Sequence, residues 1–213
     1  MQREPVTPDV LQDELLEAIA ARGSVRTYPA RTIIINEDER SDTFYIILSG
    51  RVKVFGSDTS GKEVIYSTHG PGEYVGEMAL DGGVRAASVM TMETTACSVV
   101  SGAELKGFIA LHPEFAMHLI YKLIRRAREA TDAVKNLALL DVYGRICILL
   151  TSLAEDRDGK LRIPNKLTQQ DIAERVGSSR EMVSRIFKEL VSGGYVSHDD
   201  GYWTILNKLP ARW

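Results

Sequence analysis

The spacing of apolar residues changes twice along this chain of 213 residues, and this change limits the possible folds more than any other feature of the sequence. The first long segment carries short runs of β-branched and aromatic residues, separated by turn sequences that contain glycine. The runs lie at residues 32–35, 43–48, 52–55, 64–66 and 96–100, and the turns at 49–50, 60–61, 70–72 and 81–83. Short strands at such regular intervals are typical of a β sandwich, barrel or roll.

A short helix is predicted ahead of these strands, over residues 7–21. Thr7 can cap this helix, and Pro8 fits its first turn. Its apolar face consists of Leu11, Leu15, Leu16 and Ile19. The segment is therefore a short amphipathic helix.

A long helix of about 25 residues is predicted after Pro113. Its apolar residues recur at alternating intervals of three and four, the heptad pattern of a helix that packs on another helix. The helix could pack on the β domain of its own chain. We favour pairing with a second copy, because the seam is narrow and the helix is long. The predicted dimer seam consists of Ile120, Leu123, Ala127, Ala130, Val134 and Leu137.

The last segment returns to short helices and ends in a β-hairpin. Asp141 can cap the first of these helices. The hairpin is predicted from strands at 195–198 and 202–206 around a turn at 199–201. We therefore expect a β domain at residues 1–112, a central helix and hinge at 113–140, and a third domain at 141–213.

Residues 168–188 meet the requirements of a helix-turn-helix. Such a motif needs a small residue where the helices touch, a glycine with positive φ in the turn, and apolar residues that hold both helices on a core. Ala173 supplies the close contact and Gly177 the turn, while Thr168 and Ser179 can cap the two helices. The predicted buried positions are Ile172, Val176, Val183 and Ile186. The hairpin that follows could serve as a wing.

The outward face of the second helix carries the residue types that read DNA. Arginine can donate two hydrogen bonds to guanine, glutamate can accept one from cytosine, and lysine reaches phosphate. A pair of amphipathic helices with a solvated charged face would carry the same charges, but the match over about 20 positions favours DNA binding. The predicted DNA-binding residues are Thr168, Gln170, Ser179, Arg180, Glu181, Ser184, Arg185 and Lys188.

The net charge of −3, from 26 Lys and Arg against 29 Asp and Glu, at first argues against a nucleic acid partner. The charge is unevenly distributed, however. Residues 1–140 carry 15 basic and 19 acidic side chains, whereas residues 160–188 carry 7 basic and 3 acidic ones. The acidity therefore belongs to the first two parts, and the helix-turn-helix segment is basic.

Several classes of protein do not fit the sequence. The longest apolar run, residues 146–150, is far shorter than the about 20 residues of a membrane span. The charged N-terminus does not resemble a signal peptide, so we expect a cytoplasmic protein without membrane contact. Two cysteines are too few for an iron-sulfur cluster, and four histidines without ligand spacing predict neither haem nor a metal site. The sequence shows no nucleophile paired with a suitable base, so we do not expect an enzyme.

A second motif lies at residues 72–89, where Glu77 is flanked by glycine and is followed eight residues later by Arg85. A guanidinium and the amides of a short helical turn can bind phosphate, and a carboxylate beside them can accept bonds from sugar hydroxyls. The pair fits a ribose-phosphate pocket. On spacing alone, an internal ion pair that closes a β roll fits equally well.

The order of these parts resembles the cyclic-AMP receptor protein and fumarate-nitrate regulator (CRP/FNR) family of bacterial transcription factors, over about residues 10–210. The resemblance is most specific at residues 76–80 (GEMAL), 136–146 (NLALLDVYGRI) and 176–185 (VGSSREMVSR). It implies an α+β fold, with an N-terminal β-roll of the cyclic-nucleotide-binding jelly-roll type, a central dimerisation helix and a C-terminal winged helix-turn-helix.

For the effector site, the resemblance implies that Glu77 binds a ribose hydroxyl and Arg85 a cyclic phosphate. Gly76, Met78 and Ala86 belong to the same implied site. Thr131 matches one of two hydroxyl positions on the central helix that meet adenine, and Ala130 takes the other. The loop between Glu77 and Arg85 is also shorter than in the cyclic-AMP receptor, and Ala86 replaces a serine or threonine. We expect a cyclic nucleotide, with cyclic AMP ahead of cyclic GMP, and no covalent cofactor.

For the partners, the resemblance implies a homodimer on palindromic double-stranded DNA with TGTGA-like half-sites, acting with RNA polymerase. Arg180, Glu181 and Arg185 match the base-reading residues. Two alternatives stay open. The same regulator could respond to another effector or be constitutively active, or the chain could be a cyclic-nucleotide-binding module that acts on a protein partner.

Overall fold

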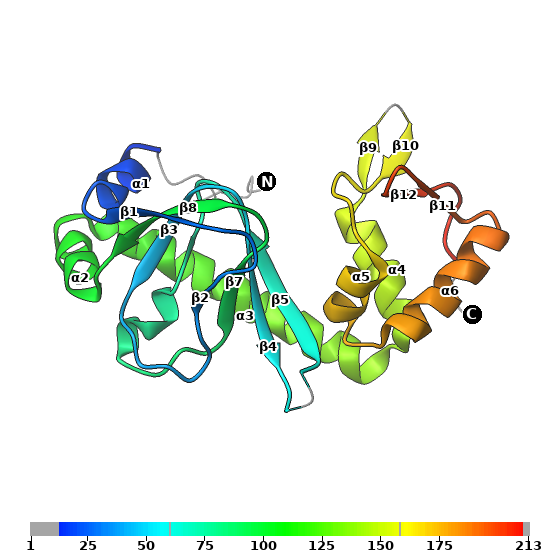
Figure 1. Cartoon of the computed structure of the whole chain (residues 1–213), viewed down its shortest axis with the longest axis horizontal. Helices are drawn as coiled ribbons and strands as arrows, with labels where there is room; N and C mark the ends of the chain where they lie inside the picture. The colour runs from blue at the N-terminus through cyan, green and yellow to red at the C-terminus, as the bar shows by residue number, and fades with distance from the viewer. Residues whose placement is uncertain (1–12, 60, 158, 211–213) are drawn as a thin grey trace, which may run out of the picture. The chain divides into compact units, whose positions relative to one another are not determined.

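A computed structural model describes residues 13–59, 61–157 and 159–210 (Figure 1). The chain divides into two compact units, one of residues 1–56 and 65–128 and one of residues 57–64 and 129–213. The predicted N-terminal helix is present as α1 (Asp13–Ala20). Thr7, Pro8 and Leu11, which were expected to begin it, lie outside the described residues.

Two four-stranded sheets form the β roll that the sequence predicted. In the first sheet the strand order is β1 (Ser24–Tyr28), β8 (Thr95–Val100), β3 (Phe44–Ser49), β6 (Tyr74–Val75). In the second sheet it is β2 (Ile33–Ile35), β7 (Ser88–Thr91), β4 (Val52–Ser57), β5 (Glu63–His69).

The central strand β3 explains why the roll is stable. Successive side chains of a strand point to opposite faces, and four consecutive residues of β3 are buried. Phe44 and Ile46 pack in a cluster with residues of α1, α2 (Gly102–Leu111) and α3 (Pro113–Leu139). Tyr45 and Ile47 pack on the other face, with residues of both sheets. The strand is therefore covered on both sides.

The long helix α3 confirms the predicted helix after Pro113. Its buried residues are Phe115, Leu119 and Lys122, which follow one another at intervals of four and three and face the first unit. All six residues of the predicted seam are exposed. The face that packs on the β roll is thus a different face from the heptad seam.

The second unit has one core, built by α4 (Val142–Leu153), α5 (Gln169–Val176) and α6 (Arg180–Ser192) with a small sheet. The strand order of this sheet is β11 (Val196–Asp199), β12 (Tyr202–Ile205), β10 (Lys160–Arg162), β9 (Glu155–Arg157). Asp141 caps α4, as expected, because its side chain accepts from the backbone N–H of Gly144. Trp203 Nε1 donates to the carbonyl oxygen of Leu167 at 2.9 Å and ties the sheet to the helix-turn-helix.

The sequence did not predict five of the described strands. β1, β9 and β10 carry almost no buried residue, so their apolar pattern is weak, and β6 has only two residues. β7 is a four-residue strand in which only alternate residues are buried. The closing hairpin was predicted, but Asp199 belongs to β11 and not to the turn. Among the described helices, none is long and apolar enough to cross a membrane.

Candidate functional site

A glycine sets the geometry at the start of the candidate effector site. Strand β6 ends at Val75, and Gly76 then adopts a φ of +96°, which residues with a side chain rarely tolerate. A Cβ atom at this position would also lie 2.7 Å from the carbonyl oxygen of Thr43. The chain can therefore turn sharply here into a short 3-10 helix, η1 (Glu77–Asp81), as the sequence predicted.

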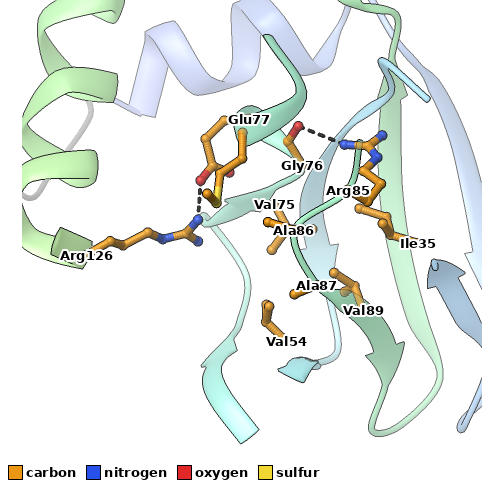
Figure 2. Close-up of a pocket in the computed structure, with 11 residues that line it drawn as sticks. Ile35, Val54, Val75, Gly76, Glu77, Arg85, Ala86, Ala87, Val89 and Arg126 are labelled. Carbon is orange, nitrogen blue, oxygen red and sulfur yellow. Dashed lines mark hydrogen bonds and ion pairs between the residues drawn. The ribbon is translucent and has the colours of Figure 1, made fainter. Parts of the chain in front are cut away.

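An open cavity, with about 380 Å³ of empty space that includes open solvent, lies beside this turn (Figure 2). Five of the six predicted effector-binding residues line it: Gly76, Glu77, Met78, Arg85 and Ala86. Its remaining lining is apolar apart from one arginine, and consists of Ile35, Val54, Val75, Ala87, Val89 and Arg126. A mostly apolar hollow with a few charged groups is the usual form of a small-molecule site.

Glu77 is a buried carboxylate with only one of its oxygens in use. The residue is 3% exposed, and Oε1 forms an ion pair with Nη1 of Arg126 from α3 (Figure 2). Oε2 is also buried and has no partner among the described residues. Because buried polar atoms nearly always have a hydrogen-bond partner, this oxygen is a ready acceptor for a ligand hydroxyl.

Arg85 lines the same cavity but directs its guanidinium to the protein. Nη1 donates to the carbonyl oxygen of Gly76 at 2.9 Å, and Nη2 donates to Ser41 Oγ at 2.9 Å and to the carbonyl oxygen of Thr43 at 2.6 Å. Burial lowers the pKa of Arg85, but an arginine remains cationic. On spacing alone an internal ion pair between Glu77 and Arg85 was an alternative, but Glu77 pairs with Arg126, and Arg85 holds the loop before β3.

Sequence reasoning missed Arg126, which lies 49 residues after Glu77 in the chain. A signal for it was present. Phe115, Leu119, Lys122 and Arg126 are spaced 4, 3, 4, so they share one face of α3. This face differs from the apolar seam because its last two residues are basic. The first three are buried against the β roll, and Lys122 Nζ donates to the carbonyl oxygen of Tyr74 at 3.0 Å. The fourth reaches the cavity.

Thr131, the sixth predicted effector residue, lies on α3 in the second unit and is exposed. Ala130 beside it is exposed as well. Contact of Thr131 with a ligand stays a prediction.

The helix-turn-helix has the local geometry that its sequence predicted. Thr168 and Ser179 cap α5 and α6, and Gly177 adopts a φ of +64° between them. Ala173 is buried in one core cluster with the four predicted apolar positions Ile172, Val176, Val183 and Ile186. The motif is therefore fixed on the core of the second unit.

The predicted DNA-binding residues of α6 lie on its open face. Arg180, Glu181, Arg185 and Lys188 are exposed, and Ser184 is half-buried. Hydrogen bonds from its own backbone N–H and from Ser179 lower the pKa of Glu181, so this side chain is a carboxylate that can accept. Thr168, Gln170 and Ser179 are exposed at the N-termini of α5 and α6.

The predicted seam of α3 is an apolar stripe whose residues are exposed in the part of the chain that the structure describes. Ile120 is 46% exposed and Leu123 42%, while Val134 and Leu137 are 66% and 57% exposed. Ala127 and Ala130 complete the stripe. So many exposed large apolar residues in one line are typical of an interface.

Comparison with known protein families accounts for both units. The cyclic nucleotide-binding domain matches residues 25–112, and the Crp-like helix-turn-helix domain matches residues 144–209. The chain belongs to the CRP/FNR family. Within it, the cAMP-activated global transcriptional regulator CRP of Salmonella typhimurium is 34% identical over 190 residues, which cover 87% of this chain and 90% of the relative. The CRP-like cAMP-activated global transcriptional regulator of Mycobacterium tuberculosis is 32% identical, over 79% of this chain and 78% of the length of that relative.

Solved structures agree with the CRP/FNR fold. The c-di-GMP responsive global regulator CLP of Xanthomonas campestris superimposes with a TM-score of 0.80 at 24% identity, over 92% of this chain and 100% of that chain. A CooA mutant from Carboxydothermus hydrogenoformans superimposes with a TM-score of 0.81 at 16% identity, over 93% of this chain and 92% of that chain. The chain is thus a CRP-like transcription regulator with a cyclic nucleotide-binding domain and a helix-turn-helix domain.

Proposed function

We propose that this protein is a homodimeric regulator whose affinity for DNA is controlled by a cyclic nucleotide in the β-roll cavity, with cyclic AMP ahead of cyclic GMP. The observation that carries the proposal is the buried Oε2 of Glu77, which has no partner among the described residues, on a side chain that lines this cavity. A ribose hydroxyl would supply the missing donor. The relatives named as cAMP-activated regulators support this choice of nucleotide.

The other residues of the cavity have separate roles in this proposal. Arg85, with Gly76, Met78 and Ala86, forms the wall against the cyclic phosphate, and the apolar residues accept the sugar and the base. Thr131 offers a hydroxyl to the base. Because Arg85 already donates to Ser41, Thr43 and Gly76, a phosphate there would have to exchange some of these bonds.

Calorimetric titration of the full chain with cyclic AMP and then cyclic GMP tests the effector. The Glu77→Gln variant keeps the shape of the side chain but loses the charge, and a hydrogen bond to a charged group contributes about 1.5–3 kcal/mol. We expect affinity to fall about 10- to 150-fold. Glu17→Gln, on the exposed face of α1, is the control and should bind normally. No heat from either nucleotide with the unmodified chain would reject the proposal.

Arg85→Ala is a poorer test. It would remove the proposed phosphate ligand, but it would also remove the bonds that hold Ser41 and Thr43. A loss of binding in that variant would therefore have two explanations.

For DNA binding, we propose that α6 enters the major groove of a palindromic site with TGTGA-like half-sites. Arg180, Glu181 and Arg185 read base edges, with Ser184 beside them, and Thr168, Gln170, Ser179 and Lys188 contact the backbone. A gel-shift assay on such a palindrome and on a scrambled duplex, with and without cyclic AMP, tests this. Shift of the palindrome without nucleotide would indicate constitutive activity, and no shift at all would favour action on a protein partner.

The two copies of the dimer pair through the stripe on α3, which places two recognition helices about 34 Å apart. Val134→Glu should shift sedimentation towards the monomer, because it puts a charge into the seam. Arg128→Glu, on the same helix but off the seam, should not. In this proposal the protein acts on RNA polymerase in the cytoplasm and catalyses no reaction.

A further inference from the structure

A buried histidine joins the Glu77–Arg126 pair to a second carboxylate. His69, at the end of β5, is 8% exposed. Its Nδ1 lies 2.9 Å from Oε1 of Glu73, and its Nε2 lies 3.2 Å from Nη2 of Arg126 and 2.9 Å from Oγ of Ser67. Arg126 in turn pairs with Glu77. Glu73, His69, Arg126 and Glu77 therefore form a continuous chain that ends in the cavity.

These contacts determine which nitrogen of His69 carries the proton. A guanidinium can only donate, so Nε2 must accept from Arg126 and must be unprotonated. Nδ1 then carries the hydrogen and donates it to Glu73. Burial acts to raise the pKa of Glu73, but bonds from His69 and from the Gly70 N–H outweigh burial and lower it to about 2, so Glu73 is a carboxylate. The arrangement requires a neutral His69.

A second proton on His69 would reverse the contact with Arg126. Nε2 would become a donor facing a donor, and two cations would lie side by side. The protonated ring still has partners, because Glu73 accepts from Nδ1–H and the Ser67 hydroxyl can accept from Nε2–H. Lys122 of α3 acts on the carboxylate of Glu73, whose pKa it helps to lower. His69 thus has two satisfied states, and only the neutral state holds Arg126.

We propose that His69 is a proton-sensitive positioning residue of the effector site: its neutral form holds Arg126 on Glu77, and effector binding takes up a proton at His69. The inference rests on the proposed function. Loss of the bond to His69 frees Arg126 to leave Oε1 of Glu77, so that this oxygen, as well as Oε2, can accept a ribose hydroxyl. The added positive charge also favours an anionic ligand. Both effects predict tighter binding as the pH falls.

The pH dependence of cyclic AMP affinity tests the inference, measured by calorimetry between pH 5.8 and 7.4. Uptake of one full proton corresponds to about a tenfold gain in affinity for each unit of decreasing pH, and partial uptake to less. The unmodified chain should show this gain, and His69→Gln, which cannot gain a proton, should lose it. His112→Gln is the control, since His112 is partly exposed and bonds to Glu114 instead.

Two further experiments still test the inference if His69→Gln folds poorly. Ser67→Ala removes the acceptor of the protonated state, so the gain should move to lower pH. Nitrogen NMR of the ligand-free chain, labelled at histidine, should show the Nδ1–H tautomer of His69 at pH 7.4. An Nε2–H tautomer, or an unchanged pH slope in His69→Gln, would overturn the inference alone. No binding of cyclic AMP by the unmodified chain at any pH would overturn the proposed function, and the coupling with it.

Discussion

Arg145, in the first turn of α4, donates from Nε to the carbonyl oxygen of Val176 at 2.9 Å, at the C-terminal end of α5. The same guanidinium donates from Nη1 to the carbonyl oxygen of Leu140, also at 2.9 Å. The last carbonyls of a helix have no partner within it, so Arg145 satisfies one that would otherwise be unpaired. It thereby ties the segment after α3 to the turn of the helix-turn-helix.

Arg145→Met should therefore destabilise the second unit. The variant keeps most of the side-chain stem but leaves two carbonyl oxygens without their charged donor, at a cost of about 1.5–3 kcal/mol. Urea unfolding followed by tryptophan fluorescence measures this, because both tryptophans lie in residues 129–213 and Trp203 is buried in the core. The exposed Arg157→Met is the control and should change stability by less than about 0.5 kcal/mol. Equal unfolding curves for the two variants would contradict the role of Arg145.

Substitution of Gly177 in the turn should be limited by the backbone conformation at this position and not by the size of the new side chain. Its φ is +64°, and among the described residues a Cβ atom there would meet only Leu137 Cδ2 at 3.7 Å, an ordinary contact. Gly177→Ala should cost about 1–2 kcal/mol, whereas Gly177→Asn should cost less, since asparagine tolerates this conformation. Thermal unfolding of the two variants compares them directly. A larger loss with asparagine would mean that space, and not φ, limits the position.

The sequence predicted best those features that depend on neighbouring residues. Capping by Asp141, Thr168 and Ser179 and the turn at Gly177 are settled within a few positions, and all four were predicted. The apolar stripe of α3 could be predicted for the same reason, because the spacing of its residues is local, whereas its role as a dimer seam stays a prediction.

Features that depend on distant residues were missed. The bond between Arg126 and Glu77 joins residues 49 apart, and the bonds of Arg85 to Ser41 and Thr43 span more than 40. The spacing of eight residues between Glu77 and Arg85 predicts that both side chains can reach one cavity. It does not predict with which residue each of them forms hydrogen bonds or an ion pair. The charged strand β10 is held by pairing with β12, which no local pattern of its own could reveal.

Arg180 and Lys188 should affect DNA binding in different ways. Arg180→Ala should lose about 1–3 kcal/mol of discrimination at one base pair, because it removes a base contact. Lys188→Ala is the matched comparison. It should weaken binding to all sequences alike and reduce the salt dependence by about one charge. Fluorescence anisotropy on a set of single-base operator variants at several salt concentrations measures both. If Arg180→Ala weakened all sites equally, Arg180 would be a phosphate contact only.

Lys122 should make stability depend on pH above neutrality. Burial lowers the pKa of Lys122 to about 8, with Arg126 adding to the effect and Glu77 and Glu73 opposing it. The ordinary value is 10.5, so between about pH 8 and 10.5 the unfolded chain binds more protons than the folded one, and stability rises with pH. Below pH 8 both states are protonated, and the folded chain bears the full cost of a buried charge over the ring of Tyr74.

Lys122→Met removes this charge while keeping a flexible side chain over Tyr74. Relative to the variant, the unmodified chain should therefore gain stability from pH 8 to pH 10, and the difference should be constant between pH 6 and 7. Thermal unfolding of both proteins over this range measures the difference, in which other titrating groups cancel. Lys106→Met, at an exposed position of α2, should run parallel to the unmodified chain throughout. A difference between Lys122→Met and the unmodified chain that does not change above pH 8 would mean that Lys122 keeps its proton in the folded state.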